Sequence, residues 1–109
     1  MTVTIDEFKK LEIKIGQILS AEKVPETDKL LRLSVDMGEG TPRQIVSGIA
    51  SFFPDPKVLV GKKCAFAVNL EPRVIKGLES QGMILAVNGE GFFSLLETSL
   101  DVTNGSVVK

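Results

Sequence analysis

The sequence predicts a small all-β barrel preceded by a short helix, and three observations lead to this prediction. Apolar and polar residues alternate strictly over residues 31–37, which is typical of a half-buried strand. The apolar pattern changes phase at Gly16, which indicates a bulge or sharp bend in a strand. Pro56 follows Asp55 between two strand-like segments, which indicates one helical turn. We expect residues 1–109 to form a single domain.

The helix is expected over residues 4–10. Thr4 and Glu7 have the spacing of a capping box, in which each side chain bonds the backbone N–H of the other residue. Phe8 and Leu11 follow on one apolar side. Because so short a helix is not stable alone, we expect it to dock on another surface.

The first strand begins at Leu11, where apolar residues alternate with charged ones through Ile15. After Gly16 the apolar parity moves to Ile18. One long, bent strand of this kind is expected to serve both halves of a closed barrel.

Four further strands follow in order. The second covers residues 30–37, a glycine turn leads to the third at 43–49, and the fourth covers 63–70 after the helical turn. The fifth covers residues 82–87. This order matches an OB-fold barrel, although periodicity alone also fits other small barrels.

A C-terminal β extension lies beyond the five strands. Asn88-Gly89 predicts a tight turn, and residues 92–96 predict a further strand. The apolar side chains of this strand need a partner surface, either a barrel edge or a second subunit.

The composition excludes most catalytic chemistry. The chain has no histidine and a single cysteine, so histidine-based nucleophiles and histidine or multi-cysteine metal sites are excluded. We expect a non-catalytic binding domain without a cofactor or metal. Cys64 is expected to be a buried strand residue. With no apolar segment long enough to span a bilayer and no signal-peptide pattern, the chain fits a cytoplasmic protein.

The net charge of −1 hides an uneven distribution. Residues 29–76 carry eight basic and four acidic side chains. Residues 1–28 carry four basic and six acidic side chains, and residues 77–109 carry one basic and four acidic. The middle is therefore +4 between flanks of −2 and −3. A local positive patch of this kind suits phosphate contacts, although a merely solvated face is also compatible with it.

Two sets of polar residues are candidates for a binding site. On the second strand Arg32 is expected to face outward, with Lys29 and Arg43 at the strand starts, and both a phosphate-binding strip and ordinary solvent exposure remain open. Arg73 and Lys76 lie in a proline-braced turn, well placed to meet an anionic backbone.

Residues beside that turn are harder to assign. Asn69 and Ser80 are small polar groups that often cap turns, so a structural role stays open for both. Phenylalanine is the only aromatic residue type, and Phe52 and Phe53 are expected to anchor a loop. Few stacking platforms favour recognition of folded RNA by shape, through phosphates and 2′-hydroxyls.

Residues 28–36, 43–49 and 69–86 together resemble the tRNA-binding domain that is appended to many methionyl-tRNA synthetases. The same domain occurs as a free-standing, structure-specific tRNA-binding protein. The resemblance implies an OB-fold that binds tRNA at the outer corner of the L-shaped molecule and supplies RNA affinity to a synthetase. It implies that the loop at residues 80–83 lines the RNA site, and that the chain is a homodimer joined through terminal segments.

The residue pattern and the resemblance together predict two surfaces. The predicted tRNA-binding residues are Lys29, Arg32, Arg43, Asn69, Arg73, Lys76, Ser80, Gln81 and Met83. The predicted dimer-interface residues are Phe8, Phe92, Phe93, Leu95 and Leu96.

The sequence departs from the family pattern in places. Thr27 stands where the family has alanine, and Val74 and Ile75 stand where it often has a further lysine, which predicts weaker RNA affinity. Two alternatives remain. A secretion-chaperone branch of the same fold binds unfolded polypeptides, and a degraded domain would serve only for dimerisation.

Overall fold

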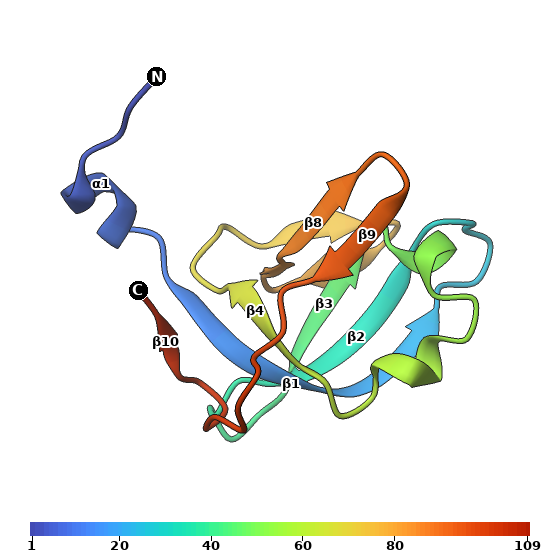
Figure 1. The fold of residues 1–109 in the computed structure, drawn as a ribbon. Coiled ribbons are helices and arrows are strands. Elements are labelled where there is room, and N and C mark those ends of the chain that lie inside the picture. Colours follow the sequence, from blue (N-terminus) through green and yellow to red (C-terminus); the bar gives the residue numbers. More distant parts are fainter.

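The computed structural model describes residues 1–109, which form short strands with three short helical segments (Figure 1). No helix is both long and apolar enough to cross a membrane. The elements in chain order are α1 (Ile5–Lys9), β1 (Ile13–Lys23), β2 (Leu31–Asp36), β3 (Arg43–Ser47), η1 (Ala50–Phe52), η2 (Pro56–Leu59), β4 (Lys63–Ala67), β5 (Arg73–Ile75), β6 (Leu78–Ser80), β7 (Met83–Ile84), β8 (Ala86–Gly89), β9 (Phe92–Leu95) and β10 (Val107–Val108).

Strand β1 belongs to both halves of a barrel. Its first half pairs with β4 and its second half pairs with β2, both antiparallel. β3 continues the sheet beyond β2, and β7 continues it beyond β4, so the order is β3-β2-β1-β4-β7 (Figure 1). The predicted five-stranded, all-β barrel of OB type is confirmed, including the long shared strand.

The bend in β1 lies later than predicted. The register with β2 shifts between Ile18 and Ser20, which leaves Leu19 unpaired and 45% exposed. This is a β-bulge, and it increases the local twist that lets one strand curve around the barrel. The bulge predicted at Gly16 is therefore displaced, although the phase change that indicated it is real.

Gly16 has a different role, which is close packing. A β carbon at this position would collide with Met37 Sδ and lie 2.6 Å from Val35 Cγ1. The glycine thus lets β1 approach the side chains of Val35 in β2 and of Met37 just after it.

The core fills the barrel with aliphatic side chains around one phenylalanine. The largest fully buried side chains are Phe66, Ile18, Leu31, Leu33, Ile45, Leu59, Val35 and Cys64. Burial of each large apolar side chain stabilises the fold by about 1.5–3 kcal/mol relative to exposure. Burial also raises the pKa of the Cys64 thiol to about 11, so it stays protonated. The prediction of a buried strand cysteine is confirmed.

The predicted helical turn between the third and fourth barrel strands is also confirmed, as η2. Asp55 caps it, since its Oδ1 accepts a hydrogen bond of 3.1 Å from Lys57 N. Leu59 at its end is fully buried.

The C-terminal extension is a hairpin followed by a returning strap. β8 and β9 pair around Glu90-Gly91, so the turn predicted at Asn88-Gly89 lies two residues later. Gly89 instead lies in β8, beneath the ring of Phe92. A β carbon at Gly89 would overlap that ring. Gly91, with φ of +81°, supplies the left-handed conformation that the turn needs.

The strap then runs back to β1 and covers its outer edge. Gly105 N donates to Ile15 O at 2.7 Å, and Ile15 N donates to Ser106 O at 2.8 Å, before β10 pairs with the start of β1. Of the two partner surfaces considered for residues 92–96, a barrel edge is the one observed within the chain, because Ala65 N in β4 donates to Leu96 O at 3.0 Å.

Helix α1 stands apart from the barrel (Figure 1). The predicted capping box is present: Glu7 N donates to Thr4 Oγ1 at 3.1 Å, and Thr4 N donates to Glu7 Oε1 at 3.0 Å. The helix ends at Lys9 and buries none of its residues, so Phe8 remains 40% exposed. The expected docking surface is not supplied by the rest of this chain.

We predict that Gly16→Ala destabilises the fold by about 1–3 kcal/mol, because the added methyl group overpacks the contact with Met37 and Val35. Urea unfolding curves of the variant and the unsubstituted protein measure this change. Gly48→Ala is the matched control, since a β carbon at Gly48 meets no atom within 4 Å. Equal stability of the two variants would contradict the prediction.

Candidate nucleic-acid interface

Residues 69–86 contain a β-hairpin rather than a loop, which corrects the proline-braced turn expected here. β5 and β6 pair along their whole length around Lys76-Gly77, whose φ angles are +51° and +79°. Positive φ at both central residues characterises the type I′ hairpin turn. Gly77 adopts this conformation freely, whereas Lys76 does so at a cost of roughly 1 kcal/mol. The hairpin therefore holds an exposed lysine at its tip.

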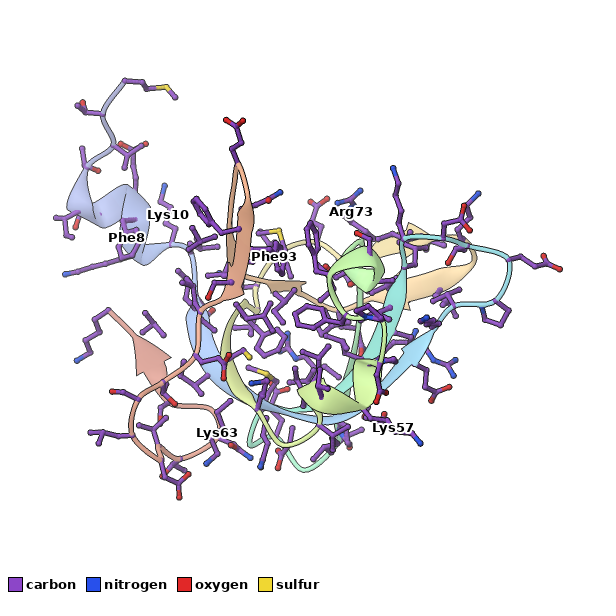
Figure 2. The ribbon with its side chains drawn as sticks, turned by 45° about the vertical axis from the view of Figure 1, so that its right-hand side comes forward. Phe8, Lys10, Lys57, Lys63, Arg73 and Phe93 are labelled. Atoms are coloured by element: carbon purple, nitrogen blue, oxygen red, sulfur yellow. The ribbon has the colours of Figure 1, made fainter.

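The two cations of this hairpin have no acidic partner. Arg73 and Lys76 are both exposed, and neither belongs to any of the five ion pairs of the chain. Figure 2 shows Arg73 at the upper edge of the molecule, whereas Lys57 and Lys63 lie at the lower edge. Their positive charge is thus available to an anion from solvent.

A small hollow lies at the base of the hairpin and brings three predicted site residues together. Its volume is about 60 Å³, and its lining includes Arg73, Ser80 and Met83. Met83 is 47% exposed, whereas Ser80 is 4% exposed. The hollow places a charged group beside an exposed thioether, an arrangement suited to contact with both the backbone and an apolar part of a ligand.

Ser80 fastens β6 to the free edge of β3. Its Oγ accepts from Val46 N at 3.0 Å and lies 3.0 Å from Gly82 O, to which it donates. The hydroxyl thereby satisfies an edge-strand N–H that the barrel would otherwise leave buried and unpaired. Of the two roles left open for Ser80, the structural one is observed.

Gln81 continues the same seam. Its Oε1 accepts from Gln44 N at 2.9 Å, while its backbone N donates to Gln44 O at 2.8 Å. In return Gln44 Nε2 donates to Glu79 O at 2.9 Å. We call this contact of Ser80 and Gln81 with β3 the closure seam, because it joins β3, one end of the curved sheet, to the segment that leads into β7, its other end.

Arg43 also bridges the closure seam. Its Nη1 donates to Val68 O at 2.6 Å and to Gln81 O at 3.0 Å, while Nε and Nη2 donate to the two carboxylate oxygens of Glu39 at 2.8 and 2.9 Å. Hydrogen bonding from Arg43 holds the pKa of Glu39 below its usual value, and the same pair raises the pKa of Arg43. Most donors of this guanidinium are therefore engaged within the chain.

The other two cations of the predicted strip differ from each other. Arg32 is paired with Glu22, with Nη2 and Oε2 3.1 Å apart. Lys29 is exposed and belongs to no ion pair. Of Lys29, Arg32 and Arg43, only Lys29 is unpaired, as Arg73 and Lys76 are.

Asn69 holds the N-terminal segment. Its Oδ1 accepts from Glu12 N at 2.8 Å, and its Nδ2 donates to Lys10 O at 2.6 Å. Both polar atoms of the amide are thus used to fix the link between α1 and β1. The structural role left open for Asn69 is the one observed.

The predicted dimer residues do not form one surface. Leu95 is only 6% exposed and belongs to the core of its own chain. Phe93 stacks on Phe52 at a centroid distance of 4.0 Å and meets Phe53 edge-on, which confirms that these two phenylalanines anchor a loop. Phe92 and Leu96 are exposed on the β8–β9 side.

Phe8 lies on a separate apolar groove between α1 and β10. The groove has a volume of about 430 Å³, and six of its nine lining residues are hydrophobic, among them Ile5, Leu11, Val107 and Val108. All five of these apolar side chains are exposed.

Sequence reasoning missed the contributions of Gln44 and Glu39. Both act through partners far along the chain or across a turn, and neither residue type is distinctive by itself. The one available signal was the spacing of Glu39 and Arg43, four residues apart with opposite charges across a hairpin turn.

Comparison with known proteins identifies one family. The model of the family described as "Putative tRNA binding domain" matches residues 13–107. The methionine–tRNA ligase of Lactococcus lactis subsp. lactis is 45% identical over 107 residues, which is 97% of this chain. The chain spans only 16% of the length of that ligase.

Two solved structures share the whole fold. The MetRS-related protein from Pyrococcus horikoshii superposes with a TM-score of 0.91 at 40% identity, covering 100% of this chain and 99% of that one. The chaperone CsaA from Bacillus anthracis superposes with a TM-score of 0.86 at 26% identity, and each chain is fully covered.

We predict that Ser80→Ala lowers the free energy of unfolding by about 1–3 kcal/mol, because Val46 N loses its only partner in a dry environment. Chemical denaturation measures the loss. Ser99→Ala, at an exposed position, is the matched control and should leave stability within about 0.5 kcal/mol. A Ser80→Ala protein as stable as the control would mean that the hydroxyl does not fasten the seam.

Proposed function

The chain belongs to the tRNA-binding domain family, and from this membership we propose that it binds folded tRNA without catalysing a reaction. The observation that carries the proposal is the β5–β6 hairpin, which projects Arg73 and unpaired Lys76 beside the hollow containing Met83. Rigid placement of two cations suits a phosphate backbone of fixed curvature.

Whether a cation is already in an ion pair determines how strongly we propose that it binds phosphate. Lys29, Arg73 and Lys76 are free of acidic partners, so their full charge would release counterions from a phosphate. Five other cations are already neutralised in ion pairs: Lys14, Arg32, Arg43, Lys62 and Lys63. We therefore propose that Lys29, Arg73 and Lys76, the unpaired cations of the predicted site, supply most of the phosphate affinity, with Met83 as an apolar contact beside them.

The buried and bonded residues of the predicted site support it indirectly in this proposal. Ser80, Gln81 and Arg43 would fix the hairpin in place, and Asn69 would fix the N-terminal segment. The shortage of exposed aromatic side chains near the hairpin supports recognition by shape rather than by base stacking.

Two contexts are compatible with the family. The likeness to methionine–tRNA ligases supports a role as a domain that supplies RNA affinity to a synthetase, whereas the likeness to the Pyrococcus horikoshii protein, 99% of whose chain is covered, supports a free-standing form. We propose for either context that residues 1–109 act as one domain and work in the cytoplasm.

We further propose that the chain is a homodimer. The apolar groove between α1 and β10 exposes Phe8, Ile5 and Val107, and burial of these side chains against a second copy would supply the docking surface that α1 lacks. A helix of five residues is not stable alone, which supports a partner at this place.

Binding of unfolded polypeptides is the rival function. The likeness to the chaperone CsaA supports it, although the identity of 26% is well below the 40% shared with the MetRS-related protein. Competition between tRNA and an unfolded peptide for the chain separates the two functions.

We predict that tRNA binding weakens steeply with added salt, and that Arg73→Ala and Lys76→Ala each reduce the slope of log K against log salt by about one. Each variant removes one phosphate contact while leaving the fold intact. Gel-shift titrations across a salt series measure the slopes.

Lys57→Ala is the matched control for Lys76→Ala. Lys57 is also exposed and unpaired but lies at the opposite edge of the molecule from Arg73 (Figure 2), so its loss should leave the slope unchanged. Salt-insensitive binding, or no binding at low salt, would overturn the proposed function.

For the dimer, we predict that Phe8→Glu converts the protein to a monomer, because it places a charge in the apolar groove. Light scattering gives the mass in solution. Val58→Glu, at another exposed apolar position outside the groove, should keep the mass of two chains. A monomeric unsubstituted protein would end the dimer proposal.

A further inference from the structure

A polar groove crosses the outer face of β1, β2 and β3. Its volume is about 260 Å³, and its floor carries Ser20, Ser34 and Gln44. Pairing places these residues in one row, since Ser20 lies opposite Ser34 and Ser34 lies opposite Gln44. Neighbouring strands are about 4.8 Å apart, so the row extends for about 10 Å.

The row has spare hydrogen-bonding capacity. The hydroxyls of Ser20 and Ser34 bond to no other group of the chain, and the Oε1 of Gln44 is likewise without a partner, because Gln44 uses only its Nε2 toward Glu79 O. Each hydroxyl can both donate and accept. Three adjacent groups of this kind suit a ligand that itself presents hydroxyls.

The charge of the groove argues against a phosphate site. Arg32 and Arg43 also line it, but a carboxylate at hydrogen-bonding distance neutralises each, Glu22 for the first and Glu39 for the second. No aromatic side chain lines the groove, so it offers no stacking surface for a base. Of the three parts of a nucleotide, the ribose is the one that matches a neutral, hydroxyl-bearing surface.

One end of the groove is linked by a hydrogen bond to the hairpin that we propose to hold phosphates. The Nε2 of Gln44 donates to Glu79 O in β6, so the end of the row touches the strand beside Arg73. A strand of RNA whose phosphates meet Arg73 and Lys76 can therefore extend across the row.

We propose that the Ser20–Ser34–Gln44 row binds ribose 2′-hydroxyls and makes the chain discriminate RNA from DNA. The 2′-hydroxyl is the group by which a protein distinguishes the two nucleic acids. This inference rests on the proposed function, because it presupposes that the hairpin binds a nucleic-acid backbone.

The test compares a tRNA transcript with its all-2′-deoxy copy of the same sequence, titrated against the full chain at one salt concentration. We expect tighter binding of the transcript. Ser20→Ala and Ser34→Ala should each weaken binding of the transcript by about 2- to 10-fold, the net contribution of one neutral hydrogen bond, and leave binding of the deoxy copy unchanged. Ser99→Ala, which lies outside the groove, should change neither.

The outcomes separate this inference from the proposed function. If both nucleic acids bind equally, or if the serine variants weaken both alike, the row does not read ribose while the proposed function stands. If neither nucleic acid binds, the proposed function and this inference both fall. Loss of preference in the two row variants, each with an unchanged unfolding curve, supports the inference.

Discussion

The closure seam is the constraint on which the rest of the structure depends. The five-stranded barrel leaves the outer N–H and C=O groups of β3 without a strand partner, and a buried edge of this kind is costly. Side chains complete the pairing instead. Ser80 satisfies Val46, and Gln81 exchanges two hydrogen bonds with Gln44. Because these side chains come from the end of β6 and the turn after it, closing the barrel also sets the position of the β5–β6 hairpin.

Arg43 strengthens the closure seam with charged hydrogen bonds. Its guanidinium reaches Val68 O on one side and Gln81 O on the other, so it links β3 to both segments that must meet there. Glu39 orients it through two parallel hydrogen bonds, an arrangement stronger than a neutral pair and specific in direction. Arg43, which the sequence suggested as a ligand-binding cation, is thus part of the framework that holds the hairpin proposed to bind RNA.

The sequence predicted the elements whose signals are local. The Thr4–Glu7 capping box, the Asp55-Pro56 turn and the alternation of β2 each lie within a few residues, and each is present. The β5–β6 hairpin was missed because its strands have three residues each and its turn is Lys-Gly rather than Asn-Gly. The roles of Ser80 and Asn69 depend on partners 34 and 57–59 residues away, which no local pattern encodes.

The division between paired and unpaired cations reconciles a net charge of −1 with the proposed binding of a polyanion. Screening limits each charge to a range of about 8 Å at physiological salt, so only the local arrangement matters. Carboxylates neutralise the arginines on the strand face, whereas the hairpin tip keeps its positive charge and holds Lys76 in a conformation that it would not adopt freely. Strain of this kind persists only where the surroundings enforce it. The same seam that closes the barrel therefore holds two unpaired cations, Arg73 and Lys76, on one projecting hairpin and leaves the arginines of the adjoining face paired.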